Sequence, residues 1–194
     1  MGLVRVGTAI ENMTSNHRGI QAGSAFLWLY KAWAQGNAER GIVALPPDAK
    51  VVEVGCGGCH SLGYLLDVAP PGWTIYSIDP YVGEGRFRDW VRTCYEKLGD
   101  VIDRVNFIRF PSPRAAALFD ERSLDAVLID GDHDEAPTNQ DIQTWRWKVR
   151  PGGYLAGDDC DPMFLGCERA WERLSDDVGD VKLWGSTSVW RVPQ

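Results

Sequence analysis

The chain has 194 residues, of which 44% are hydrophobic and 24% are charged, so we expect one globular domain over residues 1–194. Its formal net charge of -7 argues against non-specific nucleic-acid binding and against binding to an anionic membrane surface, because both need clustered Lys and Arg. The sequence has neither a run of 18 apolar residues nor the apolar stretch of a signal peptide. We therefore expect a cytoplasmic protein with no membrane partner and with its five cysteines reduced.

Apolar, β-branched runs alternate along the chain with amphipathic runs of helical spacing. An N-terminal helical extension is expected over residues 1–45, followed by a cofactor-binding core over residues 46–194. The predicted strands are 49–55, 74–80, 105–110, 124–132 and 154–159, and a strand pair within 181–192 that turns at Gly185-Ser186. The predicted helices are 19–35, 61–69, 86–99, 113–120, 136–149 and 166–176, with a turn at 151–153.

This alternation predicts an α/β fold with a Rossmann-like, doubly wound, mostly parallel seven-stranded sheet. Helices should cover both faces, and an antiparallel C-terminal hairpin should lie at one edge. In open sheets of this kind, ligands bind beyond the carboxyl ends of the strands, at the point where the strand order reverses. Acidic residues follow four of the five parallel strands, so chemistry is expected there: Glu53, Asp79, Asp130 with Asp132, and Asp158 with Asp159.

Residues 51–63, VVEVGCGGCHSLG, allow several interpretations. The CGGCH segment has the spelling of a c-type haem attachment site, and Cys56 and Cys59 could also form a thiol-redox pair or half of a zinc site. Haem attachment requires export, and the other cysteines are not spaced to complete a zinc site. A nucleotide-binding turn explains more residues, because Gly55 and Gly57 permit a tight turn before a helix that Ser61 opens.

The residues of this turn resemble the first motif of class I S-adenosylmethionine-dependent methyltransferases. Glu53-Val-Gly55-Cys-Gly57 is similar to their E/D-x-G-x-G pattern, and the resemblance extends from about residue 45 to the end of the chain. It implies S-adenosylmethionine as cofactor. Two positions depart from the family pattern, since Cys59 stands at the third glycine and Pro111 replaces an acid.

Cofactor contacts are implied by the same resemblance. The family's cofactor-binding positions correspond here to Glu53, Gly55, Gly57, Ser61, Asp79, Ser112 and Asp130. Among them, Asp79 would bind the ribose hydroxyls, Ser61 the methionine carboxylate and Ser112 the adenine.

Two later motifs, IDGDH (129–133) and AGDD (156–159), resemble the metal-dependent O-methyltransferases of the catechol and macrocin types. That resemblance implies Mg²⁺, or another divalent cation, held by Asp130, Asp158 and Asp159. The catalytic base would be His133, at the position of a lysine in the catechol type, or Asp132, at the position of the base in the macrocin type. A metal ion lowers the pKa of a hydroxyl group, and the base then removes its proton.

Taken together, these residues favour a Mg²⁺-dependent O-methyltransferase that acts on a hydroxyl of a small-molecule acceptor. The acceptor surface would come from the N-terminal helix or from the second subunit of a homodimer. One alternative is a metal-independent or non-catalytic relative that binds S-adenosylmethionine. Another is an NAD-dependent Rossmann oxidoreductase, against which His60 speaks because it replaces the third glycine of GxGxxG. A thiol-redox or haem protein is the third.

Overall fold

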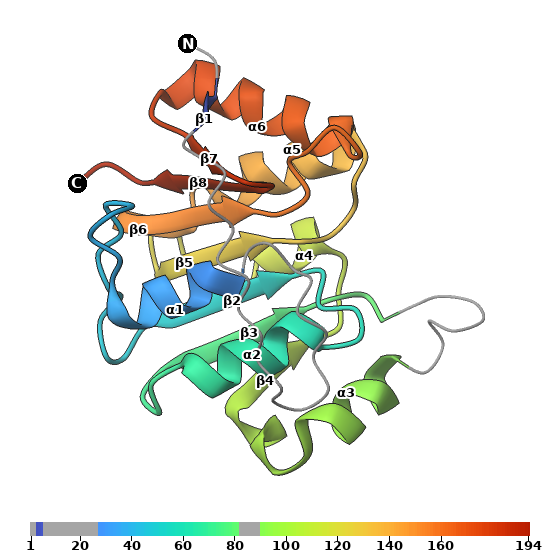
Figure 1. Cartoon of the computed structure of the whole chain (residues 1–194). Coiled ribbons are helices and arrows are strands. Elements are labelled where there is room, and N and C mark those ends of the chain that lie inside the picture. Colours follow the sequence, from blue (N-terminus) through green and yellow to red (C-terminus); the bar gives the residue numbers. More distant parts are fainter. Residues whose placement is uncertain (1–2, 6–26, 82–89) are drawn as a thin grey trace.

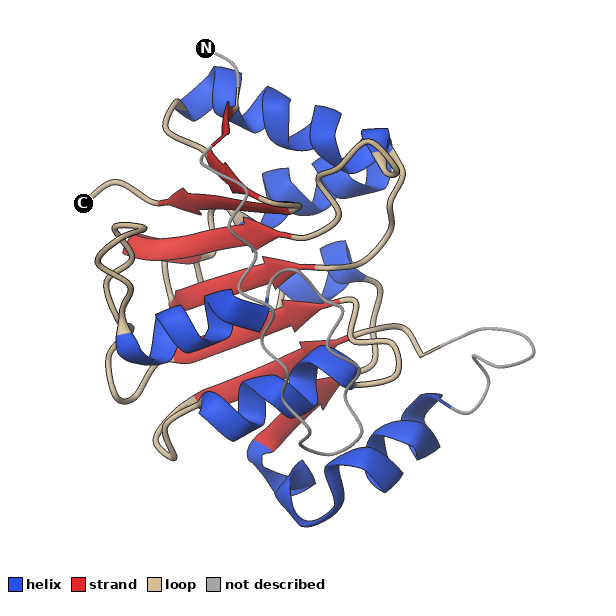
Figure 2. Cartoon of the chain, in the orientation of Figure 1, coloured by secondary structure: helices blue, strands red, loops and turns tan. Residues whose placement is uncertain are grey.

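The computed structural model describes residues 3–5, 27–81 and 90–194, in which a single sheet is covered by helices on both faces (Figure 1 and Figure 2). Its strands are β1 Val4–Arg5, β2 Lys50–Val54, β3 Thr74–Ile78, β4 Val105–Ile108, β5 Leu124–Ile129, β6 Val149–Gly157, β7 Lys182–Trp184 and β8 Thr187–Arg191. Its helices are α1 Leu27–Gln35, α2 His60–Val68, α3 Trp90–Leu98, α4 Ser112–Ala116, α5 Glu135–Trp145 and α6 Leu165–Val178, with a 3-10 turn, η2, at Gly99–Arg104. None of these helices is long and apolar enough to cross a membrane.

The strand order is β1-β7-β8-β6-β5-β2-β3-β4, and β8 runs antiparallel to both of its neighbours. The central strand β2 pairs in parallel with β3 on one side and with β5 on the other. The order therefore reverses between β2 and β5, where a doubly wound sheet binds its ligands. The predicted seven-stranded sheet with its C-terminal hairpin is confirmed, and the two-residue strand β1 adds a short edge that was not predicted.

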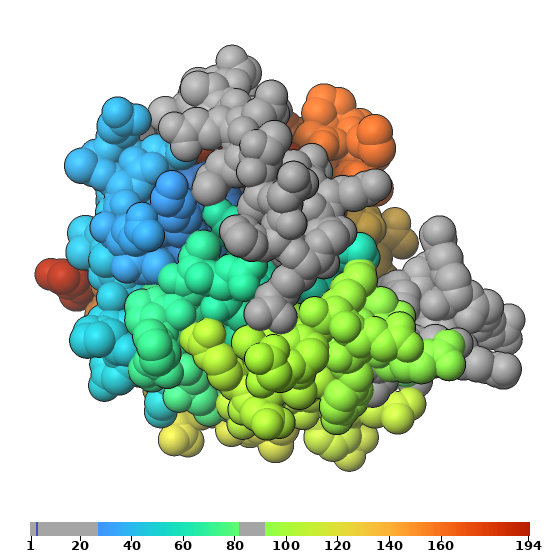
Figure 3. Space-filling model, turned by 60° about the horizontal axis from the view of Figure 1, so that its bottom comes forward, coloured from blue at the N-terminus to red at the C-terminus, as the bar shows by residue number. Residues whose placement is uncertain are grey.

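Two hydrophobic layers hold the sheet, and alternate residues of each central strand point into opposite layers. Val51 packs with α1, α2 and α3, whereas Val52 packs with α4, α5 and α6. Figure 3 shows the segments that contain α1 (blue), α2 (blue-green) and α3 (light green) on one side of the molecule. Burial on both faces explains why the parallel strands read as nearly continuous apolar runs.

The turn predicted at residues 151–153 falls within the range of β6, where it forms an irregularity: Gly152 has a φ of 78°, and the pairing with β5 passes from Leu124 opposite Val149 to Ala126 opposite Tyr154. The amide of Gly152 donates to the carbonyl of Val192 at 2.8 Å, and the amide of Val192 donates to the carbonyl of Gly153 at 2.9 Å. These bonds pair the segment with the residues that follow β8, and α5 ends at Trp145 rather than at the predicted residue 149. The first part of the predicted helix 19–35 and the start of helix 86–99 lie outside the described residues.

Candidate functional site

A hollow of about 580 Å³ lies at the carboxyl ends of the central strands. It occupies the place where the strand order reverses, as expected for the ligand site of this fold. Its lining includes Gly55, Gly57, Asp79, Pro80, Ser112, Asp130, Asp132, His133 and Asp141. Most of the residues predicted from the sequence therefore converge on one cavity.

The turn after β2 is closely fitted against the end of β5. Gly55 has a φ of 88°, and a Cβ atom there would lie 2.0 Å from the carbonyl oxygen of Asp130, so only glycine fits. The amide of Gly57 donates to Oδ2 of Asp79 at 2.9 Å, and the amide of Tyr81 donates to Oδ1 at 2.6 Å. Asp79 thus braces the turn while lining the hollow.

Glu53 and Ser61 lie behind the turn rather than on the wall of the hollow. Glu53 is fully buried and accepts hydrogen bonds from the hydroxyls of Tyr30, at 2.9 Å, and of Ser61. Burial raises the pKa of Glu53 to about 7, although the two hydrogen bonds oppose the shift. This contact ties β2 to α1 and to the first turn of α2, so both residues support the turn that follows β2, residues 55–59, from its buried side.

The raised pKa of Glu53 predicts that the free energy of unfolding of this protein depends on pH. Its folded pKa of about 7 lies above its ordinary value of 4.5, so its contribution to stability is complete at low pH and is lost as the pH rises through 7. The loss amounts to about 3 kcal/mol at most. Glu53→Gln, which cannot ionise, should lose less stability between about pH 5 and pH 8. Urea midpoints of both proteins across this range measure the difference, and parallel curves would refute it.

Three carboxylates gather at the ends of β5 and β6. Oxygen atoms of Asp130, Asp158 and Asp159 lie within 4.8 Å of one another. Burial, followed by the charge of Asp158, raises the pKa of Asp130, and burial, followed by the charge of Asp159, raises the pKa of Asp158 to about 7. Ser186 holds Asp158 in place by donating to its Oδ1 at 2.9 Å. A divalent cation among these groups would offset both burial and repulsion.

Of the two predicted bases, His133 contacts this acidic cluster and Asp132 contacts the backbone that follows it. Nε2 of His133 lies 2.7 Å from Oδ2 of Asp159, and the imidazole stacks on Phe164 with ring centroids 4.3 Å apart. Asp132 accepts a hydrogen bond from the amide of Asp134 at 2.9 Å and so shapes the entry to α5. His133 is therefore oriented by side chains, whereas Asp132 also serves the local backbone.

Elsewhere on the wall of the hollow, Ser112 meets an acid that was not predicted. The indole Nε1 of Trp145 donates to the Ser112 hydroxyl at 2.8 Å, and this hydroxyl also forms a hydrogen bond with Asp141. Asp141 is buried, and burial raises its pKa to about 6. Asp141 lies four residues before Trp145, and residues at that spacing share one face of a helix. The sequence could therefore have indicated that Asp141 and Trp145 lie on the same side of α5.

The prediction of five reduced cysteines is wrong for two of them. Cys59, before α2, and Cys94, in α3, form a disulfide with 5.2 Å between their Cα atoms. They are separated by 35 residues, and only the packing of α3 beside the turn that follows β2 brings them together. Cys56, Cys160 and Cys167 are buried free thiols. Cys59 has a φ of 59°, so it adopts the left-handed conformation usual for a glycine.

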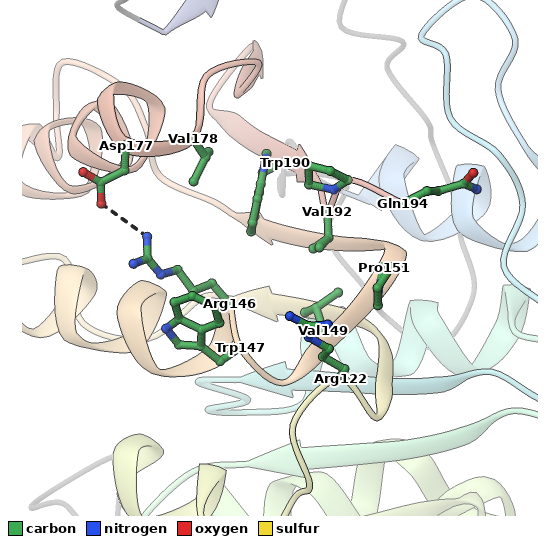
Figure 4. A pocket seen from close by; sticks show the side chains of 11 residues that line it. Arg122, Arg146, Trp147, Val149, Pro151, Asp177, Val178, Trp190, Val192 and Gln194 are labelled. Atoms are coloured by element: carbon green, nitrogen blue, oxygen red, sulfur yellow. Dashed lines mark hydrogen bonds and ion pairs between the residues drawn. The ribbon is translucent and has the colours of Figure 1, made fainter.

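A second hollow, of about 550 Å³, lies near the C-terminal ends of α5, α6 and β8 (Figure 4). Arg146 and Asp177 form an ion pair at its side with 3.2 Å between Nη1 and Oδ2. Trp147 and Trp190 contribute to its wall. Its lining contains none of the strand-end acids, whereas Asp79, Asp130 and Asp132 line the first hollow.

A family profile described as a methyltransferase domain matches residues 52–160. A search of curated proteins finds no match.

Solved structures of low sequence identity share the fold. The O-methyltransferase NovP is 17% identical with a TM-score of 0.64, over 87% of this chain and 79% of NovP. CalS11, a TDP-rhamnose 3'-O-methyltransferase of calicheamicin biosynthesis, is 18% identical with a TM-score of 0.57, over 85% of this chain and 77% of CalS11. A candidate rRNA-methylase from Clostridium thermocellum is 16% identical with a TM-score of 0.56, over 73% of this chain and 86% of that protein. The family match over more than half of the chain, on a fold with its glycine turn and Asp79 at the reversal point, shows that the chain belongs to the methyltransferase domain family as a class I S-adenosylmethionine-dependent methyltransferase.

Proposed function

We propose that this methyltransferase is Mg²⁺-dependent and transfers its methyl group to a hydroxyl of a small molecule. The observation that carries the proposal is the cluster of Asp130, Asp158 and Asp159 beside the cofactor hollow. Carboxylate oxygens are the ligands that Mg²⁺ prefers, and a shared cation accounts for three acids in one place. The fold shared with NovP and CalS11, both named as O-methyltransferases, supports transfer to oxygen.

The hollow has suitable groups for each part of S-adenosylmethionine. Asp79 offers carboxylate oxygens to the ribose hydroxyls, and the glycines at 55 and 57 let backbone approach the methionine end closely. Ser112 and Asp141 would stand at the adenine end, where a carboxylate can accept a hydrogen bond from the exocyclic amino group. Asp141 would then supply the acid that the third-strand motif lacks at Pro111.

Residues around the acidic cluster would prepare the acceptor. Bound Mg²⁺ would supply positive charge that lowers the pKa of the acceptor hydroxyl. Asp159 accepts from Nε2–H of His133 in the tautomer that leaves Nδ1 able to take up a proton, and stacking on Phe164 orients the ring. In-line transfer needs donor and acceptor held in one orientation, which fixed groups on both sides of the hollow would provide.

The choice between the two bases can be tested with matched isosteres. His133→Gln should lower kcat by about a hundredfold or more across pH 6–9, because general bases typically contribute that much. Asp132→Asn should lower it far less, because its oxygen can still accept from the Asp134 amide. Rates are compared at saturating Mg²⁺ after metal binding has been checked for each variant. A wild-type rate for His133→Gln throughout this range would exclude it as the base.

The proposed function itself is tested by following the labelled methyl group of S-adenosylmethionine. The acceptor panel should contain catechols, other phenols, nucleotide-linked sugars and ribosomal RNA. We expect transfer to a hydroxylated small molecule that stops in excess EDTA and returns when Mg²⁺ is restored. Full activity in EDTA would refute the metal requirement. Transfer to RNA alone, as the named activity of the Clostridium thermocellum protein suggests, would refute the acceptor class.

A further inference from the structure

Three cysteine sulfurs meet at the turn after β2, residues 55–59, called here the cofactor turn because of its proposed role. Cys59 is bonded to Cys94, and Sγ of Cys56 lies 3.2 Å from Sγ of Cys59. All three residues are buried. Figure 1 and Figure 3 both show α3 alongside α2, which begins directly after Cys59. The cluster therefore joins the turn to a neighbouring helix at a point that methyl transfer itself does not need.

Helix α3 contacts the turn at two neighbouring residues, Gly58 and Cys59. The disulfide fixes Cys59, and Nζ of Lys97 donates to the carbonyl of Gly58 at 3.1 Å. The preceding residue, Gly57, donates its amide to Asp79 inside the hollow. Movement of Gly58 and Cys59 would therefore directly disturb the hydrogen bond between Gly57 and Asp79.

The backbone of Cys59 has a left-handed conformation, which the contacts with α3 restrain. Its φ of 59° and ψ of 31° are readily adopted by glycine but cost free energy in any residue with a Cβ atom. The family motif has glycine at this position. Here a covalent bond to Cys94 compensates for the missing glycine by restricting where Cys59 can move.

We infer that the Cys59–Cys94 disulfide is a positioning element for S-adenosylmethionine, and that Cys56 can exchange with it to release α3 from the turn. In the exchange, the thiolate of Cys56 attacks Sγ of Cys59 and the Cys59–Cys94 bond breaks. Cys94 leaves as a thiolate and takes up the proton that Cys56 lost, so no oxidant is consumed. A dithiol can instead reduce the bond, giving two protein thiols and the oxidised dithiol.

The resting protein should retain the disulfide seen in the structure. Burial raises the pKa of the Cys56 thiol, so little of the attacking thiolate forms while Cys56 stays buried. Once the bond to Cys94 is lost, the turn occupies its binding conformation for only a fraction of the time. The apparent Kd rises by the inverse of that fraction, so about tenfold if the fraction is about one tenth. The catalytic acids lie elsewhere, so kcat at saturating S-adenosylmethionine should stay within about twofold.

Calorimetric titration of the full chain with S-adenosylhomocysteine, without added metal, tests this inference. The oxidised wild type and Cys56→Ser, which retains the disulfide, should bind equally. The wild type reduced with a phosphine, and Cys94→Ser, should both bind about tenfold more weakly. Thermal melts confirm that each protein is folded. If Cys94→Ser does not fold, the phosphine-treated wild type alone provides the protein without the disulfide. Because no metal is present, the outcome does not depend on the proposed Mg²⁺ site.

Tryptic peptides identify the bonded pair. Cys56 and Cys59 share the peptide 51–86, whereas Cys94 lies in the peptide 93–97, so the two pairings differ in mass. We expect a cross-linked pair in the oxidised protein, and a Cys56–Cys59 bond within one peptide after incubation with trace thiol. Equal affinity for S-adenosylhomocysteine in all four proteins would overturn the positioning role. If reduction lowered only the melting temperature, the disulfide would stabilise the fold without positioning the cofactor. Failure to find any Cys56–Cys59 bond would overturn the exchange.

Discussion

Asp158→Asn is expected to reduce methyl transfer by about a thousandfold while changing S-adenosylmethionine affinity by less than about threefold. A metal ion contributes several kcal/mol to a transition state, and about 4 kcal/mol corresponds to that factor in rate. Asp158 belongs to the acidic cluster at the end of β6 and is held by Ser186, so the amide would fit without disturbing the fold. Turnover at increasing Mg²⁺ concentrations, together with calorimetric titration of the cofactor, separates the two effects.

Asp48→Asn provides the matched control for this experiment. Asp48 is exposed and lies just before β2, at the end of the sheet away from the hollow, so the same chemical change should leave turnover unaltered. Wild-type turnover of Asp158→Asn at every Mg²⁺ concentration would show that Asp158 does not act through a metal.

Gly55→Ala is expected to have the largest effect on folding among single changes at the turn. Its added Cβ would lie 2.0 Å from the carbonyl oxygen of Asp130, and its φ of 88° is already unfavourable for alanine. Relieving the clash would separate the cofactor turn from the end of β5. We expect a loss of about 3 kcal/mol or more in the free energy of unfolding, with no measurable cofactor binding.

Gly41→Ala separates backbone strain from the clash. Gly41 also has a positive φ, of 66°, but a Cβ there would meet nothing within 4 Å. That substitution should cost only about 1 kcal/mol and leave cofactor affinity unchanged. Urea unfolding of both variants provides the comparison, and equal losses would mean that the contact between Gly55 and Asp130 is not tight in solution.

The sheet could be predicted because its strands are buried on both faces and so read as apolar runs. Val51 and Val52 show the reason, since each packs into a different hydrophobic layer. The sequence was less informative at the start of β6, where a segment whose composition indicates a turn also pairs with Val192 and so becomes an irregular part of the strand. Such pairing depends on residues distant in the sequence, which local patterns do not record.

The hollow could be predicted for a related reason. Parallel strands end at one edge of the sheet, so acids that follow successive strands must lie near one another, as Asp79 and Asp130 do. The disulfide could not be predicted, because Cys94 approaches Cys59 only through the packing of α3. Asp141 was missed because it lies within a helix rather than at a strand end.

The metal site is the central claim about the chemistry of this enzyme, and it can be tested without knowing the acceptor. Mn²⁺, which substitutes for Mg²⁺ at oxygen sites, can be titrated into the protein with S-adenosylhomocysteine bound and followed by electron paramagnetic resonance. We expect about one tightly bound ion per chain in the wild type and in Asp48→Asn, and loss of that ion in Asp158→Asn. Absence of a bound ion in the wild type, or undiminished binding in Asp158→Asn, would contradict a metal site at Asp130, Asp158 and Asp159.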